Sequence, residues 1–434
     1  MENTGKTKAK KQVLQSPKGM HDILPQDQPL WDRVYRIARD VSEYYNFKHI
    51  ETPMVERSEL FERSIGEATD IVEKQMFTFK TKSRESLTLR PEGTAGIARS
   101  YIQHGLGQLG LPLKLYSAGS MFRYEQPQAG RYREFHQIEC DIISVESNPI
   151  YDAQAILVFC RILEVLKIKD LRVAVNSIGC KSCRPVYRKK LQAYYKSHKR
   201  ALCAHCVSRL DKNPLRLLDC KEEKCRALRE DAPIMIDNLC KVCREHFKHV
   251  LEYLDELELP YMLDHYLVRG LDYYTKTVFE IFTGEETVNA LGGGGRYDYL
   301  IEMLGGKITP AVGWAMGVER VIEHIKTQGI NIGIRAKKKI FIIYIGELAK
   351  KKALGLIEEL RKNNIDVDES LGRESLNAQL RIADKSGAPL ALIFGQKEAF
   401  EESIIIRDLA TGIQETVPLE KMAASVKKKL KNKG

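Results

Sequence analysis

The segment LKLYSAGSMFRYEQPQAGRYREFHQIECDIISV, residues 113–145, decides the fold because it contains two runs of alternating apolar side chains. Residues 113–125 and 133–145 each have the period of a β-strand, and the polar stretch QPQAGRY lies between them. We therefore predict an antiparallel hairpin with a long polar loop.

This hairpin has an unusual set of side chains for its length. It contains Arg123, Arg131 and Arg133, and Phe135 follows shortly after them. The fork of a guanidinium suits a phosphate, and a flat aromatic ring suits a base. Taken alone, an arginine-bearing hairpin is also typical of a solvated surface, so the rest of the chain has to decide between the two interpretations.

Length and composition limit the possibilities. A chain of 434 residues is too long for one hydrophobic core and suits two or three domains. The net charge of +11, from 69 Lys and Arg against 58 Asp and Glu, favours a polyanionic partner such as RNA. The sequence has no apolar run of membrane-spanning length, and its N-terminus lacks the apolar run of a signal peptide. We expect a cytoplasmic protein with no membrane association.

Periodicity predicts most of the other elements. A helix should begin near Asp27, with Pro29 in its first turn, and a proline-containing strand should follow over residues 47–56. We predict a further helix over 153–166 and a strand that runs into a helix over 310–325. The last hundred or so residues alternate between strand-like and helix-like patterns, which indicates a separate small α/β domain.

Two segments need a functional explanation or a structural one. The stretch YLVRGLDYYTK, residues 266–276, has the composition of a buried strand and yet contains Arg269. An ion pair with Asp272 or Asp264 would explain this arginine without a catalytic role. The run GGGG, residues 292–295, is either a tight turn or a backbone without side chains that a small ligand can approach closely.

Several strings together resemble the histidyl-tRNA synthetase family, within the class II aminoacyl-tRNA synthetases. They are KGMHDILP (18–25), LTLRPEGTAG (87–96), GRYREFHQ (130–137), LVRGLDYYT (267–275), GGGRYD (293–298), GWAMGVER (313–320) and LNAQLRIADKSGAPLALIFG (376–395). The resemblance extends from about residue 18 to 424, so it covers nearly the whole chain.

The resemblance implies an α+β fold in which an antiparallel catalytic sheet is flanked by helices. We expect the catalytic domain to be interrupted by a cysteine-rich zinc-binding insertion and followed by an α/β anticodon-binding domain. The predicted boundaries are a flexible basic arm at 1–17, catalytic parts at 18–170 and 259–328, the insertion at 171–258, a linker at 329–338 and the anticodon-binding domain at 339–434.

The activity implied is the ATP-dependent conversion of histidine to histidyl-adenylate and its transfer to the 3′ end of tRNA-His, with Mg²⁺ accompanying ATP and a homodimer as the assembly. Arg269 would lie between the histidine carboxylate and the α-phosphate, and Arg123 would hold the α-phosphate. The other ATP-binding residues implied are Arg131 at the γ-phosphate, Glu125 and Phe135 at the adenine, and Arg320 on the other adenine face.

The resemblance also implies the residues that bind histidine. Its ammonium would contact Glu92, Thr94 and Gln137, and its imidazole would meet Asp141 and Tyr274. The cavity would be lined further by Tyr273, Gly293 and Gly294, although Tyr273 could equally be part of the core. Bacterial relatives typically have glutamate where this chain has Asp141, so the shorter side chain needs a shifted strand or a water to reach the ring.

Eight of the ten cysteines form four closely spaced pairs: Cys180 and Cys183, Cys203 and Cys206, Cys220 and Cys225, Cys240 and Cys243. Such spacing is typical of tetrahedral zinc sites, and ordinary buried thiols are the alternative. We expect one or two structural Zn²⁺ ions. The preferred pairing joins the first pair with the second and the third with the fourth, and an interleaved pairing is the other possibility.

Two features bear on RNA. The basic run over residues 183–200 is either a clamp for the acceptor arm of the tRNA or a solvated helix, and the family resemblance favours the clamp. Gln128 is a candidate for contacting the acceptor end.

The rival function is that of a paralogue without catalytic activity, the regulatory subunit of ATP phosphoribosyltransferase. Such paralogues lack the C-terminal domain and tend to lose the motif arginines, whereas this chain retains Arg123, Arg269 and Arg320.

Overall fold

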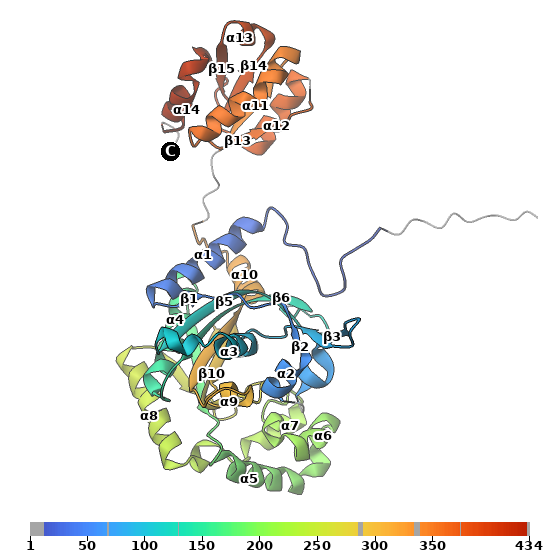
Figure 1. Cartoon of the computed structure of the whole chain (residues 1–434), viewed down its shortest axis with the longest axis vertical. Coiled ribbons are helices and arrows are strands. Elements are labelled where there is room, and N and C mark those ends of the chain that lie inside the picture. The colour runs from blue at the N-terminus through green and yellow to red at the C-terminus, as the bar shows by residue number, and fades with distance from the viewer. Residues whose placement is uncertain are drawn as a thin grey trace, which may run out of the picture. The chain divides into compact units, whose positions relative to one another are not determined.

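The computed structural model describes residues 13–66, 69–128, 130–284, 290–333, 339–373 and 375–431. The chain divides into two compact units, residues 1–334 and 335–434, and each is described here by itself (Figure 1). Within the described ranges, no helix is both long and apolar enough to cross a membrane. The described residues leave out 1–12 of the predicted arm and 334–338 of the predicted linker. The linker was expected to begin at 329, but Ile330 and Ile332 pack in the core of the first unit, so that start is too early.

The first unit is built on an eight-stranded sheet whose middle is antiparallel. Neighbouring strands pair antiparallel from β5 through to β7, and short parallel strands extend both edges. The order is β1 (Lys48–His49), β5 (Leu113–Phe122), β6 (Glu134–Ile143), β11 (Ala311–Gly317), β10 (Gly292–Arg296), β9 (Thr275–Thr283), β7 (Leu171–Ser177) and β8 (Tyr261–Leu263). The predicted hairpin is confirmed, since β5 and β6 pair from Leu113 opposite Ile143 to Phe122 opposite Glu134.

One face of this sheet is covered by helices. They are α1 (Gln28–Tyr44), α4 (Pro149–Val165), α8 (Lys241–Glu256) and α10 (Val318–Thr327). Their apolar side chains form one core with the strands, in which Phe159 stacks on Trp314 with ring centroids 4.5 Å apart. The predicted first helix is confirmed, although Asp27 makes no side-chain cap. Because this face is filled, the opposite face is the one left for a ligand.

Smaller elements surround that open face. A three-stranded sheet has the order β2 (Val55–Arg57), β4 (Ser86–Leu89) and β3 (Phe77–Lys80). It is accompanied by α2 (Ser58–Ile65), a π-helical turn (Ile71–Gln75), α3 (Thr94–Gln103), a 3-10 turn (Leu106–Leu109) and α9 (Leu300–Met303).

Two local predictions are wrong, and one of two alternatives is excluded for a third segment. The strand expected over 47–56 is split into β1 and β2, with Pro53 in the break. The strand expected around Arg269 is limited to β8, and residues 264–274 are irregular, beginning with a turn in which the Asp264 carboxylate accepts from the Tyr266 N–H (3.0 Å). Of the two interpretations of the GGGG run, the tight turn is excluded, because the run forms strand β10 in the middle of the sheet.

The cysteine-rich region forms a lobe with its own apolar cluster, which includes Tyr187, Leu191 and Tyr195. Its helices are α5 (Arg184–Ser197), α6 (Ala204–Lys212) and α7 (Glu223–Glu230), with 3-10 turns at Lys199–Ala201, Pro214–Leu217 and Ile236–Asn238. Figure 1 shows α5, α6 and α7 gathered at one end of this unit. The predicted boundaries of 171–258 were too wide, because β7 belongs to the central sheet and α8 packs in the main core.

The second unit is a five-stranded sheet with helices, as the alternating pattern predicted. The sheet order is β13 (Val367–Glu369), β12 (Ile340–Tyr344), β14 (Leu390–Phe394), β15 (Ser403–Asp408) and β16 (Gln414–Pro418). The helices are α11 (Glu347–Lys362), α12 (Leu376–Ser386), α13 (Gln396–Phe400) and α14 (Met422–Lys431), with a 3-10 turn at Leu419–Lys421. Sequence analysis missed α13 and β16, which are short, and β16 is largely exposed.

Candidate active site

Strand β6 forms one wall of the site because its side chains alternate between the two faces of the sheet. Ile138, Cys140 and Ile142 lie in the helix-covered core. The residues that alternate with them along β6 face the open side, and they are Phe135, Gln137, Glu139 and Asp141. Three of the predicted site residues are therefore brought together by the pleat of one strand.

Glu92 is held at the start of α3. Its carboxylate accepts from the backbone N–H groups of Thr94 (3.0 Å) and Ala95 (2.9 Å), and the Tyr273 hydroxyl donates to it (3.2 Å). Burial raises the pKa of Glu92 above its ordinary value. Tyr273 combines features of both interpretations, because its ring is buried in an apolar cluster while its hydroxyl contacts the Glu92 carboxylate.

Asp141 has one satisfied oxygen and one without a partner. The Tyr297 hydroxyl donates to Oδ1, which Thr94 Oγ1 also approaches at 3.5 Å. Oδ2 is buried and has no hydrogen-bond partner among the described residues, and the same is true of Gln137 Oε1. Burial raises the pKa of Asp141 to about 7. Unpaired buried acceptors are costly, so these two atoms mark where a donor from a ligand would fit.

Glu139 is a functional candidate that sequence reasoning missed. Its carboxylate accepts from the Gly93 N–H (3.0 Å) and from the Ser117 hydroxyl (3.3 Å). Burial raises the pKa of Glu139 to about 8, and the neighbouring carboxylates of Glu92 and Asp141 add to the effect. The signal that could have found it is the alternation of β6, because a residue between Gln137 and Asp141 on the same face has to lie between them in space.

Arg269 makes an ion pair with Glu280 of β9, so neither of the predicted structural partners, Asp272 and Asp264, holds it. Its guanidinium lies 5.6 Å from the ring centroid of Tyr274, and its buried Nε has no partner within the described part of the chain. Glu280 was not predicted, because its place beside Arg269 depends on how the irregular segment folds back over β9.

The two predicted glycines point to opposite faces. A Cβ on Gly293 would lie 2.8 Å from an Arg269 guanidinium nitrogen, so this position faces the site. A Cβ on Gly294 would lie 2.7 Å from the Cα of Trp314, on the face packed against helices. The prediction that both side-chain positions line one cavity is therefore wrong for Gly294, because neighbouring strand residues alternate.

The predicted ATP residues lie at the loop end of the hairpin. Arg123 donates from Nε to the Pro91 carbonyl (2.9 Å), and its guanidinium lies 5.1 Å from the ring centroid of Phe135. Glu125 pairs with Arg131 at 3.7 Å. Backbone hydrogen bonds between Gln128 and Arg131, of 2.9 and 3.1 Å, close the loop.

Arg320, at the start of α10, joins this loop to the sheet. It donates to the carbonyl of Gly130 (3.1 Å) from Nε and to that of Ala290 (2.7 Å) from a terminal nitrogen. The structure thus brings the arginines of three separate segments, Arg123, Arg269 and Arg320, to the open face of one sheet.

Comparison with known proteins assigns this arrangement to a family. A sequence model described as Histidyl-tRNA synthetase matches residues 19–321, and one described as Anticodon binding domain matches 339–429. The chain belongs to the histidyl-tRNA synthetase family. It is 44% identical over 419 residues to a histidine–tRNA ligase of Dehalococcoides mccartyi, covering 96% of this chain and all of that protein.

Other relatives agree with this result. A histidine–tRNA ligase of Aquifex aeolicus is 44% identical over 410 residues, which is 94% of this chain and all of that protein. The crystal structure of apo histidyl-tRNA synthetase from S. aureus is 33% identical with a TM-score of 0.79, and it covers 95% of this chain and 99% of that one. The similarity includes the C-terminal domain, which favours the synthetase over the regulatory paralogue.

The cysteines of the synthetase form two groups that are nested along the chain. Cys180, Cys183, Cys240 and Cys243 form an outer group, and Cys203, Cys206, Cys220 and Cys225 form an inner group. In each group the sulfurs lie within 4.8 Å of one another. The preferred pairing of the first pair with the second was wrong. The outer pairs instead meet where the chain enters α5 and where it returns into α8.

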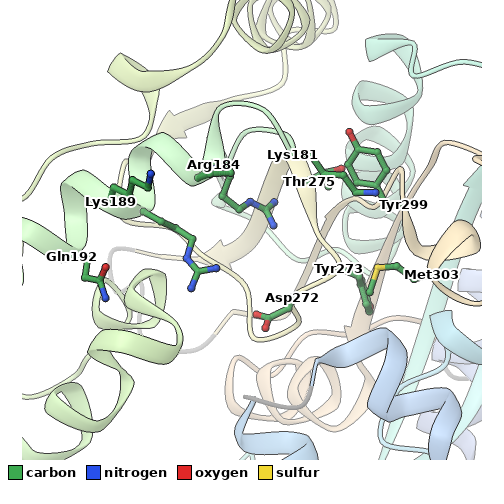
Figure 2. Close-up of a pocket in the computed structure, with 11 residues that line it drawn as sticks. Lys181, Arg184, Lys189, Gln192, Asp272, Tyr273, Thr275, Tyr299 and Met303 are labelled. Atoms are coloured by element: carbon green, nitrogen blue, oxygen red, sulfur yellow. The ribbon is translucent and has the colours of Figure 1, made fainter.

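A cavity of about 480 Å³ lies between α5, the residues that precede β9, and α9 (Figure 2). Its lining includes four cationic side chains from the insertion, Lys181, Arg184, Arg188 and Lys189. Asp272 contributes a carboxylate from the opposite side. The predicted basic run is thus a helix, and one of its faces lines this cavity.

Proposed function

We propose that this protein is a histidine–tRNA ligase, which activates histidine with ATP and transfers it to the 3′ end of tRNA-His. The observation that carries the proposal is the position of the unpaired acceptors on Asp141 and Gln137, beside Glu92 and within the cluster that contains Arg269. The regulatory paralogue would not need a polar pocket and the arginines of ATP binding in the same site.

Histidine fits this pocket by its donors. We propose that Glu92, Thr94 and Gln137 take the ammonium and that Asp141 and Tyr274 meet the imidazole, with Tyr273 and Gly293 completing the wall. Asp141 Oδ2 offers the acceptor that an imidazole N–H requires. A pocket of this kind rejects analogues that lack the hydrogen-bonding group by about 10⁴–10⁵, because its polar atoms would then stay unpaired.

The two substrate anions have to be brought together before the histidine carboxylate can attack the α-phosphorus of ATP. We propose that Arg269 lies between the carboxylate and the α-phosphate and that Arg123 stabilises the charge that develops on phosphorus. The remaining ATP contacts proposed are Arg131 at the γ-phosphate, Glu125 and Phe135 at the adenine, and Arg320 on its other face. ATP enters as its Mg²⁺ complex, and pyrophosphate leaves.

The cysteine groups fit zinc. Each supplies four sulfurs close enough for one tetrahedral ion, and four protein ligands leave no position open for a substrate. We propose two structural Zn²⁺ ions that stabilise the insertion and take no part in the reaction.

The RNA and the assembly complete the proposal. Gln128 and the basic cavity beside α5 would contact the acceptor end of the tRNA, and the C-terminal domain would bind the anticodon. The excess of positive charge supports an RNA partner. We also propose a homodimer and a cytoplasmic location.

ATP–pyrophosphate exchange with each of the twenty amino acids tests this function. We expect exchange with histidine alone, followed by transfer of histidine to tRNA-His. If folded protein exchanges with no amino acid, the ligase assignment is wrong and the regulatory paralogue becomes the better explanation.

A further inference from the structure

The segment that carries Arg269 and Tyr274 has no strand partner of its own. Residues 264–274 connect β8 to β9 without regular structure, so their position depends on contacts made from elsewhere. The first part is held by the sheet, because Asn176 of β7 donates to the carbonyls of His265 (3.3 Å) and Leu267 (3.0 Å). The second part, which contains the proposed substrate contacts, needs another support.

The insertion provides contacts to that second part. Asn213, just after α6, donates from its amide to Asp272 Oδ1 (2.9 Å), and Arg216 approaches the Arg269 carbonyl (3.3 Å). From α5, Arg184 donates to the carbonyl of Tyr274. Figure 2 shows Arg184 and Asp272 on opposite sides of the basic cavity.

The same part of the insertion is also fixed to the body of the domain. Arg209 pairs with Asp70 (2.5 Å), which Arg216 also approaches (3.6 Å), and Lys212 pairs with Glu73 (3.2 Å). Asp70 and Glu73 lie at the π-helical turn that follows α2. Residues 209–216 are therefore a bridge between that turn and the segment that carries Arg269.

Asp272 is where these supports meet. Its N–H donates to the Ile65 carbonyl at the end of α2 (3.1 Å), while its carboxylate accepts from Asn213 of the insertion. The next two residues are Tyr273, which donates to Glu92, and Tyr274, which lies beside Arg269. A shift of Asp272 is thus transmitted directly to both tyrosines of the proposed histidine pocket.

We propose that the insertion is a clamp that holds residues 269–274 in the geometry required for histidine binding, and that Asn213 and Arg184 are its positioning residues. The proposal rests on the proposed function only for the identity of the ligand. Cys203 and Cys206 of the inner group lie at the start of α6, the helix that precedes Asn213, and Arg184 directly follows Cys183 of the outer group. Both groups therefore lie on the elements that make the contacts.

The test is Asn213→Ala in the full-length protein, with steady-state exchange kinetics. We expect the KM for histidine to rise by about three- to tenfold, the range for losing one hydrogen bond, while the KM for ATP and the melting temperature change little. Asn238→Ala is the matched control, because the Asn238 amide donates to the Ile234 carbonyl inside the insertion (2.9 Å). Asn238→Ala should leave the KM for histidine and the KM for ATP unchanged.

Exchanging the amide of Asn213 and the carboxylate of Asp272 between the two positions provides a rescue experiment. Asn213→Asp alone places two carboxylates together and should impair histidine binding more than Asn213→Ala does. Adding Asp272→Asn restores an amide facing a carboxylate and should return the KM for histidine towards the wild-type value. The clamp would be refuted if the double variant did not recover the KM for histidine. It would also be refuted if Asn213→Ala raised the KM for ATP as much as the KM for histidine.

Amide hydrogen exchange tests the clamp without relying on the ligase activity. In Asn213→Ala, the peptides that cover residues 264–274 should exchange faster than in the wild type, and those from the middle of β9 should not. Unchanged exchange in that segment would refute the clamp even if histidine is the substrate. Faster exchange in a protein that activates no amino acid would support the clamp and reject only the proposed function.

Discussion

Replacing cysteines two at a time separates the nested arrangement of sulfur ligands from a sequential one. In the nested arrangement Cys180 and Cys240 belong to one group, whereas Cys180 and Cys203 belong to different groups. The double variant Cys180→Ser/Cys240→Ser then damages one site, and Cys180→Ser/Cys203→Ser damages both. The sequential arrangement predicts the reverse.

The expected magnitudes follow from the two groups of four sulfurs. The wild type should retain two zinc ions per chain, one for each group. Cys180→Ser/Cys240→Ser leaves all four thiolates in the inner group and should retain about one ion there. Cys180→Ser/Cys203→Ser leaves three thiolates in each group, so a chelator should remove both ions, because neither site keeps its four ligands. A structural zinc site provides about 10–16 kcal/mol of apparent binding free energy, so each variant should also melt at a lower temperature than the wild type.

Bound zinc can be counted by mass spectrometry of metals after gel filtration in a weak chelator, together with a melting curve for each variant. Cys160→Ser is the control, since Cys160 lies in α4 outside both groups, and it should retain two ions. The reasoning is refuted if the variant with Cys180 and Cys203 replaced retains one ion and that with Cys180 and Cys240 replaced retains none. A wild type without zinc would instead favour buried thiols.

Three other predictions concern the site. Arg269→Ala should abolish histidine-dependent exchange while ATP binding by calorimetry is largely kept, and near-normal turnover would reject its catalytic role. Because burial raises the pKa of Glu139 to about 8, its protonated form stabilises the fold, and that stability should be lost between about pH 4.5 and 8, at up to ~1.4 kcal/mol per pH unit. In urea unfolding, the stability of Glu139→Gln relative to the wild type should therefore increase as pH rises to 8. A difference in unfolding free energy that does not change with pH would contradict the raised pKa. Gly293→Ala and Gly294→Ala should each lower the free energy of unfolding by about 1–3 kcal/mol, since either Cβ would meet backbone within 2.5 Å. Only Gly293→Ala should also displace Arg269 and so slow ATP–pyrophosphate exchange. Equal ATP–pyrophosphate exchange rates per folded molecule in the two variants would contradict the assignment of faces.

Local patterns were sufficient for the longer regular elements. The hairpin of β5 and β6 follows from a period of two with a polar loop, and α1 follows from apolar residues at helical spacing after Pro29. The alternation in the C-terminal unit predicted its α/β character. The signal for each strand or helix lies within its own consecutive residues, where sequence spacing and spatial spacing are closely related.

The failures have a different physical origin. The apolar composition around Arg269 resembles a strand, but these residues are anchored by the insertion and by α2 rather than by a neighbouring strand. The partner of Arg269 is Glu280, eleven positions further along and on β9, which no local pattern indicates. The cysteine pairing likewise depends on where the two ends of the insertion meet, and equal spacing within the pairs contains no information about that.

The carboxylates of the pocket explain why such a site would prefer an amino acid with a basic side chain. Glu92, Glu139 and Asp141 lie together in a buried cluster, and burial raises the pKa of all three. Arg123 lowers the pKa of Glu92 and Arg90 lowers that of Glu139, but burial outweighs both effects. The empty pocket is therefore most stable when it holds extra protons, and ionising these groups is costly without a cation. The ammonium and imidazole N–H groups of histidine supply that positive charge and those donors at the cluster. An uncharged analogue of the same shape would leave the cost unrelieved, so the electrostatics of the free site contribute to its selectivity before any contact with ATP is made.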